Sequence, residues 1–312
     1  MRPRVTLVLA ILAVLLGGGM LVPAAYVRLA SDGGSSGDGA ESVAAPPPTA
    51  PPPPTLTNAP VSVPFDGKYF SWALMDRQTG TITGAENLTT TNSTESMIKS
   101  WIVADYLRRL GDKPLPAEQR RQAVTAIRDS DDTAAQLLYR AGGGRAVLER
   151  LISICKLTDT RIDPKARWAY TQMSPRDAVR MGDCIADGTA AGPKWTPFLL
   201  EEMANVRGTT APEDQGLKRG GGRWGIIDGL PPSITEQGPV GMKNGWTMLW
   251  ADLQWHLNCL AVTDKWSLAV MMRYPKDHGL DYGAQVCQSV TTQLVTPQPG
   301  AALKVPQPVA KP

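Results

Sequence analysis

Two serines in this sequence precede a lysine by three residues, Ser96 before Lys99 in "SMIK" and Ser153 before Lys156 in "SICK". On a helix the two members of such a pair lie on one side, so an uncharged lysine can take the hydroxyl proton and activate the serine as a nucleophile. The chain contains only two histidines, which argues against a serine–histidine triad. The spacing alone does not decide between chance and a serine nucleophile beside its proton acceptor, because it occurs twice in the chain.

The surroundings of the two pairs distinguish them. In "AVLERLISICKL" the apolar residues form one helical face, and Ser153 and Lys156 share the other side with Glu149, which predicts a solvated surface. Ser96 instead begins the first long predicted helix, residues 96–110. There the unpaired N–H groups and the positive end of the helix dipole favour a developing anion. A serine that only caps this helix is the alternative.

The remaining pattern predicts the frame around Ser96. Alternation over residues 69–87, interrupted at 78–80, favours a hairpin of two strands. Further helices are predicted within "PAEQRRQAVTAIRDS", "DTAAQLLYRA", "GRAVLERLISICKL", "SPRDAVRMGDCIADG" and "TPFLLEEMANV". Three strands and a closing helix follow, in "GPVGMKNGWTML", "WHLNCLAVT", "WSLAVMMRYP" and "YGAQVCQSVTTQLV". We expect an α+β fold in which a five-stranded antiparallel sheet is split in sequence around an all-helical lobe, with a cleft between lobe and sheet.

Three stretches, taken in order, carry a resemblance to a known family. "SMIK" from Ser96, "SDDTAAQLLY" from Ser130 and "GMKNGW" around Lys243 resemble the S-x-x-K, S-D-N and K-T-G motifs of class A β-lactamases and penicillin-binding proteins. "TRID" at 160–163 and "TQMSPRDAVRM" are similar to the segments that begin and follow the family's Ω-loop. The resemblance covers most of residues 65–295 and implies the β-lactamase/transpeptidase-like fold in a divergent member.

The resemblance also implies a role for each matching residue. Ser96 would form an acyl-enzyme and Lys99 would help to take its proton. Ser130, supported by Lys243, would pass a proton to the leaving nitrogen. The backbone N–H groups of Ser96 and Trp246 would form the oxyanion hole. The expected substrate-binding residues are Asp132, Asn244, Gly245 and Trp246.

Three departures from the family pattern bear on the chemistry. Ala166 stands where the family has the glutamate that activates the deacylating water, and the loop from Ala166 to Pro175 is short. Asp132 replaces the asparagine of S-D-N; an ionised aspartate only accepts hydrogen bonds, and it would pair with Lys99 and favour its ammonium form. Asn244 replaces the threonine or serine of K-T-G. Together these changes predict slow deacylation.

All four cysteines lie in the predicted domain. An even number in an exported chain suggests two disulfides, although four cysteines allow three pairings. We expect the local pairing, Cys155 with Cys184 and Cys259 with Cys287, which would join two helices of the lobe and tie a strand to the closing helix. The spacings match no zinc pattern, so neither a metal nor another cofactor is predicted.

The ends of the chain predict a tethered envelope protein. Residues 5–27 carry no charge and follow Arg2 and Arg4, which predicts a single-pass anchor with the remainder on the outer face of the cytoplasmic membrane. A cleaved signal peptide, and hence secretion, is the alternative. The net charge of +3, without a long basic run, argues against a nucleic-acid partner. The predicted segments are an anchor or signal (1–30), a Gly/Ser- then Pro-rich linker (31–60), the β-lactamase-like domain (61–297) and a Pro-rich tail (298–312).

Two functions compete on these observations. The first is a bacterial cell-envelope serine hydrolase or acyl transferase that acts on a β-lactam or on D-Ala-D-Ala-like amides of peptidoglycan-derived peptides. The second is a catalytically degenerate relative that serves as an envelope binding or scaffold module. Retention of the nucleophile, both lysines and Ser130 favours the first, and the substitutions at 132, 166 and 244 favour the second. A peptidoglycan-binding spacer would explain the anchor and linker but not the four retained polar residues.

Overall fold

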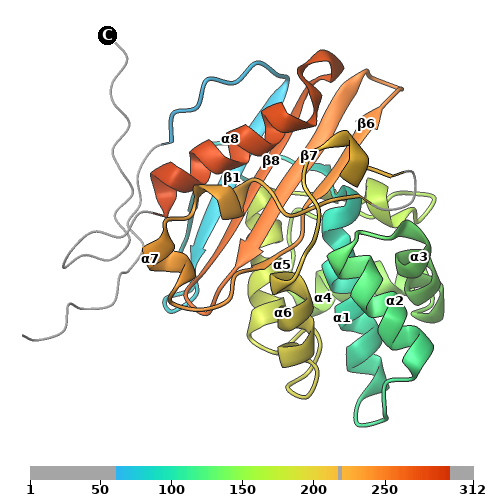
Figure 1. Cartoon of the computed structure of the whole chain (residues 1–312). Coiled ribbons are helices and arrows are strands. Elements are labelled where there is room, and N and C mark those ends of the chain that lie inside the picture. Colours follow the sequence, from blue (N-terminus) through green and yellow to red (C-terminus); the bar gives the residue numbers. More distant parts are fainter. Residues whose placement is uncertain (1–60, 217–219, 296–312) are drawn as a thin grey trace, which may run out of the picture. The chain divides into compact units, whose positions relative to one another are not determined.

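The computed structural model describes residues 61–216 and 220–295 (Figure 1). The predicted anchor, linker and Pro-rich tail lie outside the described residues. Within the described part, no helix has the length and apolar character needed to cross a membrane.

The secondary structure follows the predicted order. The strands are β1 (Tyr69–Asp76), β2 (Ile82–Gly84), β3 (Asn92–Ser93), β4 (Gln172–Met173), β5 (Gly241–Met242), β6 (Gly245–Leu249), β7 (Gln254–Val262) and β8 (Trp266–Pro275). The helices are α1 (Lys99–Leu110), α2 (Ala117–Arg128), α3 (Asp132–Ala141), α4 (Arg145–Ile154), α5 (Pro175–Ala186), α6 (Thr196–Ala204), α7 (Pro232–Thr235) and α8 (Gly279–Leu294). Short 3-10 turns are η1 (Glu95–Ile98), η2 (Trp168–Tyr170), η3 (Pro212–Asp214), η4 (Ile226–Gly229) and η5 (Lys276–His278).

One antiparallel sheet carries the domain, in the order β2-β1-β8-β7-β5, with β6 also paired to β7. β5 and β6 lie end to end along β7 in one register, since Met242 pairs with Ala261 and Gly245 with Asn258. Lys243 falls between the two ladders and still donates its N–H to β7. The sheet therefore has five strand positions, and the expected α+β fold is confirmed.

The sheet is covered on both faces. α8 packs on one face of β7 and β8, and α5 packs against β1, β7 and β8 from the other (Figure 1). This explains why eight of the nine residues of β7 are buried, a pattern expected when both faces of a strand are covered. Helices α1–α6 lie between β2 and β5 in the sequence and form the lobe beside the sheet.

α1 is the central helix of the lobe. It contacts every other helix from α2 to α6, and Trp101, Ile102 and Leu107 on it are buried. The indole of Trp101 donates to Val147 O in α4 at 2.8 Å. The helix ends before Gly111, whose φ of 58° is a left-handed conformation that glycine adopts without steric cost. The helix predicted over 96–110 is divided, because its first turn is the 3-10 turn η1.

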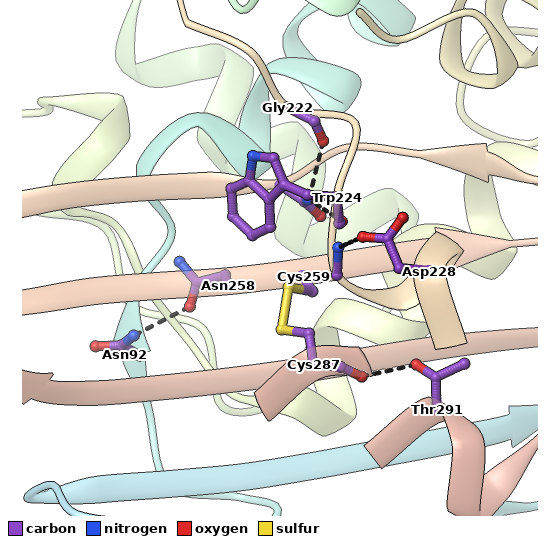
Figure 2. The surroundings of a disulfide bond; sticks show 10 residues. Asn92, Gly222, Trp224, Asp228, Asn258, Cys259, Cys287 and Thr291 are labelled. Atoms are coloured by element: carbon purple, nitrogen blue, oxygen red, sulfur yellow. Dashed lines mark hydrogen bonds between the residues drawn. A yellow bond between two sulfur atoms is a disulfide. The ribbon is translucent and has the colours of Figure 1, made fainter. Parts of the chain in front are cut away.

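Both disulfides are those predicted, Cys155–Cys184 between the end of α4 and α5, and Cys259–Cys287 between β7 and α8. Figure 2 shows the second disulfide together with Asn258, which directly precedes Cys259 on β7. Asn258 accepts from Asn92 Nδ2 at 3.0 Å, and its own Nδ2 donates to Ser93 O at 2.8 Å. Asn258 thus fixes the short strand β3, which leads directly to η1.

Candidate active site

Ser96 lies at the start of η1, the turn that leads into α1. The chain enters this turn through Glu95, whose φ of 48° is unusual for a residue other than glycine. Ser96 is half-buried, and its N–H belongs to the first turn, where N–H groups have no intrahelical acceptor. The nucleophile predicted from "SMIK" therefore has a backbone donor beside it. Ser153 and Lys156, by contrast, are both exposed.

Lys99 is fully buried one turn after Ser96. Its Nζ donates to Ser130 O at 2.5 Å, to Ser130 Oγ at 3.3 Å and to Asp132 Oδ1 at 2.5 Å. Among the described residues, no hydrogen bond joins Lys99 to Ser96. The ion pair expected between Lys99 and Asp132 is thus present, and it turns the ammonium group toward Ser130 instead of the nucleophile.

Lys243 approaches Ser130 from the sheet. It is fully buried, and its Nζ donates to Ser130 Oγ at 2.9 Å and to Asn244 O at 3.0 Å. The Ser130 hydroxyl therefore contacts an ammonium group from the lobe and another from the sheet. Ser130 itself is buried and has a φ of 52°. A non-glycine residue held in this region costs energy and is found preferentially at functional sites.

Burial alters the acidity of both lysines. It lowers the pKa of Lys99, although the carboxylate of Asp132 opposes that change. Burial, together with the positive charge of Lys99, lowers the pKa of Lys243 well below its ordinary value. Lysines with lowered pKa values supply the uncharged amine that proton transfer from serine requires.

The strand edge at Gly245 comes very close to η1. A Cβ on Gly245 would lie 2.7 Å from Ser96 N and 2.4 Å from Met97 N, so only glycine fits here. Lys243 donates its N–H to β7, and in an antiparallel strand the N–H groups of successive residues point in opposite directions. The N–H of Trp246 therefore points away from β7, on the edge that borders Ser96. The two N–H groups predicted for an oxyanion hole lie on facing elements.

Asn244 does not line the cleft as expected. Its side chain is fully buried, and its Nδ2 donates to Gly222 O at 2.9 Å and to Trp224 O at 2.8 Å. Figure 2 shows both acceptor residues on the segment beside the Cys259–Cys287 bond. Because both amide hydrogens are used, Asn244 holds this segment against the strand and does not offer its amide to a ligand. The longer side chain of asparagine reaches acceptors that a threonine hydroxyl would not.

The segment after "TRID" presents an aromatic ring where the family has a carboxylate. Ala166 has a φ of 53° and accepts a hydrogen bond from Tyr139 at 2.8 Å. Two residues later, the ring of Trp168 lies 5.3 Å from Lys99 Nζ, and its Nε1 donates to Gln136 at 3.0 Å. Trp168 is nearly buried. An indole, which cannot act as a base, thus borders Lys99.

Comparisons with known proteins concern the fold of the domain and its central segment. Residues 115–211 match a family model described as the beta-lactamase enzyme family. Solved β-lactamases from Burkholderia vietnamiensis and Streptosporangium roseum superpose with a TM-score of 0.56 at 17% identity, over 73% of this chain and 90% and 91% of theirs. The β-lactamase from Desulfarculus baarsii gives 0.54 at 16% identity, over 72% of this chain and 91% of that one. These likenesses show that the described domain has the fold of the β-lactamases.

The curated relatives of this β-lactamase-like protein are mycobacterial. It is 29% identical over 182 residues to the protein named "Putative lipoprotein LppW" in Mycobacterium tuberculosis and in Mycobacterium bovis. The match covers 58% of this chain and 54% of LppW. The chain therefore spans about half the length of the curated relatives that it matches.

The sequence did not point to three polar residues that lie near the proposed nucleophile in the fold. Glu95, Ser93 and His256 lie behind the nucleophile and are all buried. Ser93 Oγ lies 2.7 Å from Glu95 Oε1 and 2.8 Å from His256 Nδ1, at hydrogen-bonding distance from both. His256 is far from Ser93 in the sequence, so only the folding of β7 beside β3 brings the two together. One feature of the sequence could have indicated this group of residues: a charged residue, Glu95, directly precedes the proposed nucleophile.

Replacing Glu95 with glutamine tests its burial. Burial raises the pKa of Glu95 from 4.5 to about 7. Its carboxyl therefore contributes stability that is fully present below pH 4.5 and is lost as the pH rises through 7. A shift of this size corresponds to ~3 kcal/mol. Between pH 4 and pH 8, we expect the free energy of unfolding of Glu95→Gln to gain ~3 kcal/mol relative to wild type, measured by urea denaturation.

The matched control is Glu236→Gln, at an exposed glutamate. Its free energy of unfolding should keep a constant difference from wild type across the same pH range. A constant difference for Glu95→Gln as well would show that the pKa of Glu95 is the same in the folded and unfolded protein, and would contradict the effect of burial.

Proposed function

We propose that this domain is a cell-envelope serine acyl-enzyme of the β-lactamase and penicillin-binding type, which is acylated at Ser96 by its substrate and deacylates slowly. The observation that carries the proposal is the Ser130 hydroxyl, which contacts Lys99 Nζ at 3.3 Å and Lys243 Nζ at 2.9 Å beside Ser96. Burying two ammonium groups around one hydroxyl costs free energy, and proton transfer gives a reason for keeping them there.

The acylation step uses residues that the fold brings together. Ser96 Oγ attacks the carbonyl carbon of the substrate amide, and its proton passes to Lys99 in the amine form. The negative charge on the former carbonyl oxygen is held by the N–H groups of Ser96 and Trp246. The carbon–nitrogen bond then breaks as Ser130 gives its proton to the leaving nitrogen. Ser130 regains a proton from Lys99, through the contact between the Ser130 hydroxyl and Lys99 Nζ.

The deacylation step lacks its usual base. Ala166 supplies no carboxylate, and the indole of Trp168 lies against Lys99. An acyl-enzyme on Ser96 therefore waits for water without a general base, a contribution commonly worth about 10²–10⁴-fold in rate. Slow release suits a transpeptidase-like or penicillin-binding role better than a β-lactam hydrolase.

The substrate class and location follow from the family and the relatives. Amides that mimic the D-Ala-D-Ala ends of peptidoglycan-derived peptides, and β-lactams that resemble them, are the substrates proposed here. LppW is named a lipoprotein, which supports placement of this chain at the cell envelope. Two disulfides are consistent with an oxidising compartment.

A degenerate binding module is the second candidate. The sealed amide of Asn244 and the ion pair between Lys99 and Asp132 favour it, because the first removes a ligand contact and the second holds the base in its charged form. The labelling experiment below separates the two candidates.

Ser96 is expected to carry the acyl group. Intact-mass analysis after exposure to a reporter penicillin should show one adduct on the wild-type protein. Ser96→Ala should abolish it, because the nucleophile is removed, and Ser153→Ala should retain it, because Ser153 is exposed on α4. An unlabelled but folded wild-type protein would favour the degenerate module, and labelling that survives Ser96→Ala would refute the assignment of the nucleophile.

The adduct is expected to be long-lived. Because Ala166 supplies no carboxylate to activate the deacylating water, β-lactam turnover should show a stoichiometric burst followed by a nearly flat phase. Timed mass spectrometry after removal of free penicillin measures the decay of the adduct. Release within seconds would mean that another residue activates the water.

Asp132→Asn is expected to speed acylation. Loss of the carboxylate 2.5 Å from Lys99 Nζ removes the charge that opposes the lowered pKa of Lys99, so more of the lysine is uncharged. A further fall of one pKa unit would raise the labelling rate about tenfold. The control is Asp277→Asn, at a side chain that is 87% exposed, which should label at the wild-type rate. An unchanged rate for Asp132→Asn would show that Lys99 does not limit acylation as its base.

A further inference from the structure

Four polar side chains form a continuous line behind the nucleophile. Glu95 Oε1 lies 2.7 Å from Ser93 Oγ, which lies 2.8 Å from His256 Nδ1. The other ring nitrogen, His256 Nε2, lies 2.8 Å from Asp252 Oδ2. Glu95, Ser93 and His256 are buried, whereas the Asp252 side chain is 37% exposed. The line therefore runs from the surface to the residue before Ser96.

With Asp252 ionised, the donors and acceptors of this line permit two arrangements with the same number of protons. In the first, Glu95 is protonated and donates to Ser93, Ser93 donates to His256 Nδ1, and Nε2–H donates to ionised Asp252. In the second, Ser93 donates to ionised Glu95, and the imidazolium of His256 donates to Ser93 and to Asp252. In the change from the first arrangement to the second, Glu95 gives its proton to Ser93 Oγ, and Ser93 gives its own proton to His256 Nδ1. An O–H bond breaks at Glu95, an N–H bond forms at His256, and Ser93 keeps one proton throughout.

The inner end of the line lies beside the proposed oxyanion hole. Glu95 is bonded through its carbonyl carbon to Ser96 N, and its carboxyl lies within hydrogen-bonding reach of Thr247. Thr247 directly follows Trp246, whose N–H is the second donor. A negative charge on Glu95 would therefore stand next to both N–H groups and oppose the oxyanion that they stabilise.

We infer that Glu95, Ser93, His256 and Asp252 form a one-proton relay that keeps Glu95 uncharged beside the oxyanion hole. Glu95 and His256 are then positioning residues for acyl transfer, since they act through the N–H groups of Ser96 and Trp246. The part of the inference that concerns acyl transfer rests on the proposed function.

The charges around the line favour the first arrangement at neutral pH. Burial raises the pKa of Glu95 to about 7, with the negative charge of Asp132 adding to the effect and Lys99 opposing it. Burial lowers the pKa of His256, with Asp252 opposing this and the nearby charge of Arg273 adding to it. A proton thus resides on Glu95 and leaves it as the pH rises through 7.

The relay is tested without acylation by following the histidine ring nitrogens of the ¹⁵N-labelled full chain by NMR. The chain has only two histidines, and His278→Gln assigns them. In the wild type, the Nδ1 signal of His256 should shift with a midpoint near pH 7, because loss of the Glu95 proton to solvent turns the Ser93 hydroxyl from Nδ1 to the Glu95 carboxylate. Glu95→Gln and Ser93→Ala should each remove that shift. A His256 titration that is the same in the wild type and in Glu95→Gln would overturn the relay.

The role in acyl transfer is tested by the pH profile of penicillin labelling. Above pH 7 the wild-type rate should carry a falling limb of up to about tenfold per pH unit, as expected for loss of one proton. Glu95→Gln, which stays neutral, should lack this limb, whereas a merely structural role would lower the rate equally at every pH. Identical profiles would overturn the role at the oxyanion hole. A complete absence of labelling, with the NMR coupling intact, would count against the proposed function and leave the relay standing.

Discussion

The hydrogen bond from Lys243 Nζ to Ser130 Oγ connects the two halves of the domain at the site. Lys243 comes from the edge strand of the sheet and Ser130 from the loop between α2 and α3 in the helical lobe. Lys99 reaches the same hydroxyl from α1, so three separate elements converge on one oxygen. If this contact were lost, the buried Lys243 Nζ would keep only the backbone oxygen of Asn244 as an acceptor, and an incompletely paired buried charge is costly.

The balance of buried charge around that hydroxyl is uneven. Two fully buried lysines face one carboxylate, that of Asp132, whose side chain is 56% exposed. Because neither lysine can be fully neutralised by a partner, burial shifts both toward the amine form, and Asp132 restrains Lys99 more than Lys243. A purely structural core would gain from apolar replacements here. Retention of the pair is the physical argument for proton transfer at this site.

Two departures from the family pattern place a side chain in contact with the protein itself. Asn244 binds backbone carbonyls of the neighbouring segment, and Trp168 borders the lysine where a water-activating carboxylate is expected. In each case the substituted side chain makes a contact within the protein in place of the one the family pattern predicts. Glu95 and His256 place titratable groups behind the proposed nucleophile, in a line of hydrogen bonds through Ser93.

The sequence by itself determined the order of the elements, the α+β fold, the local pairing of the cysteines and the presence of Ser96, Lys99, Ser130 and Lys243. These follow from local periodicity and from short motifs, which the chain carries within a few residues. It also indicated the ion pair between Lys99 and Asp132, because the family places those positions in one cleft.

Only the tertiary structure decided where Asn244 points and what lies behind Ser96. The amide of Asn244 finds its acceptors at Gly222 and Trp224, on a segment that folds back along the strand, and no local pattern encodes that contact. Ser93 and His256 are 163 positions apart, and they meet because the fold places β3, which pairs with β4 in a separate sheet, against β7. Hydrogen bonds between distant residues depend on the packing of whole elements, so their partners are fixed by the fold and not by neighbouring residues.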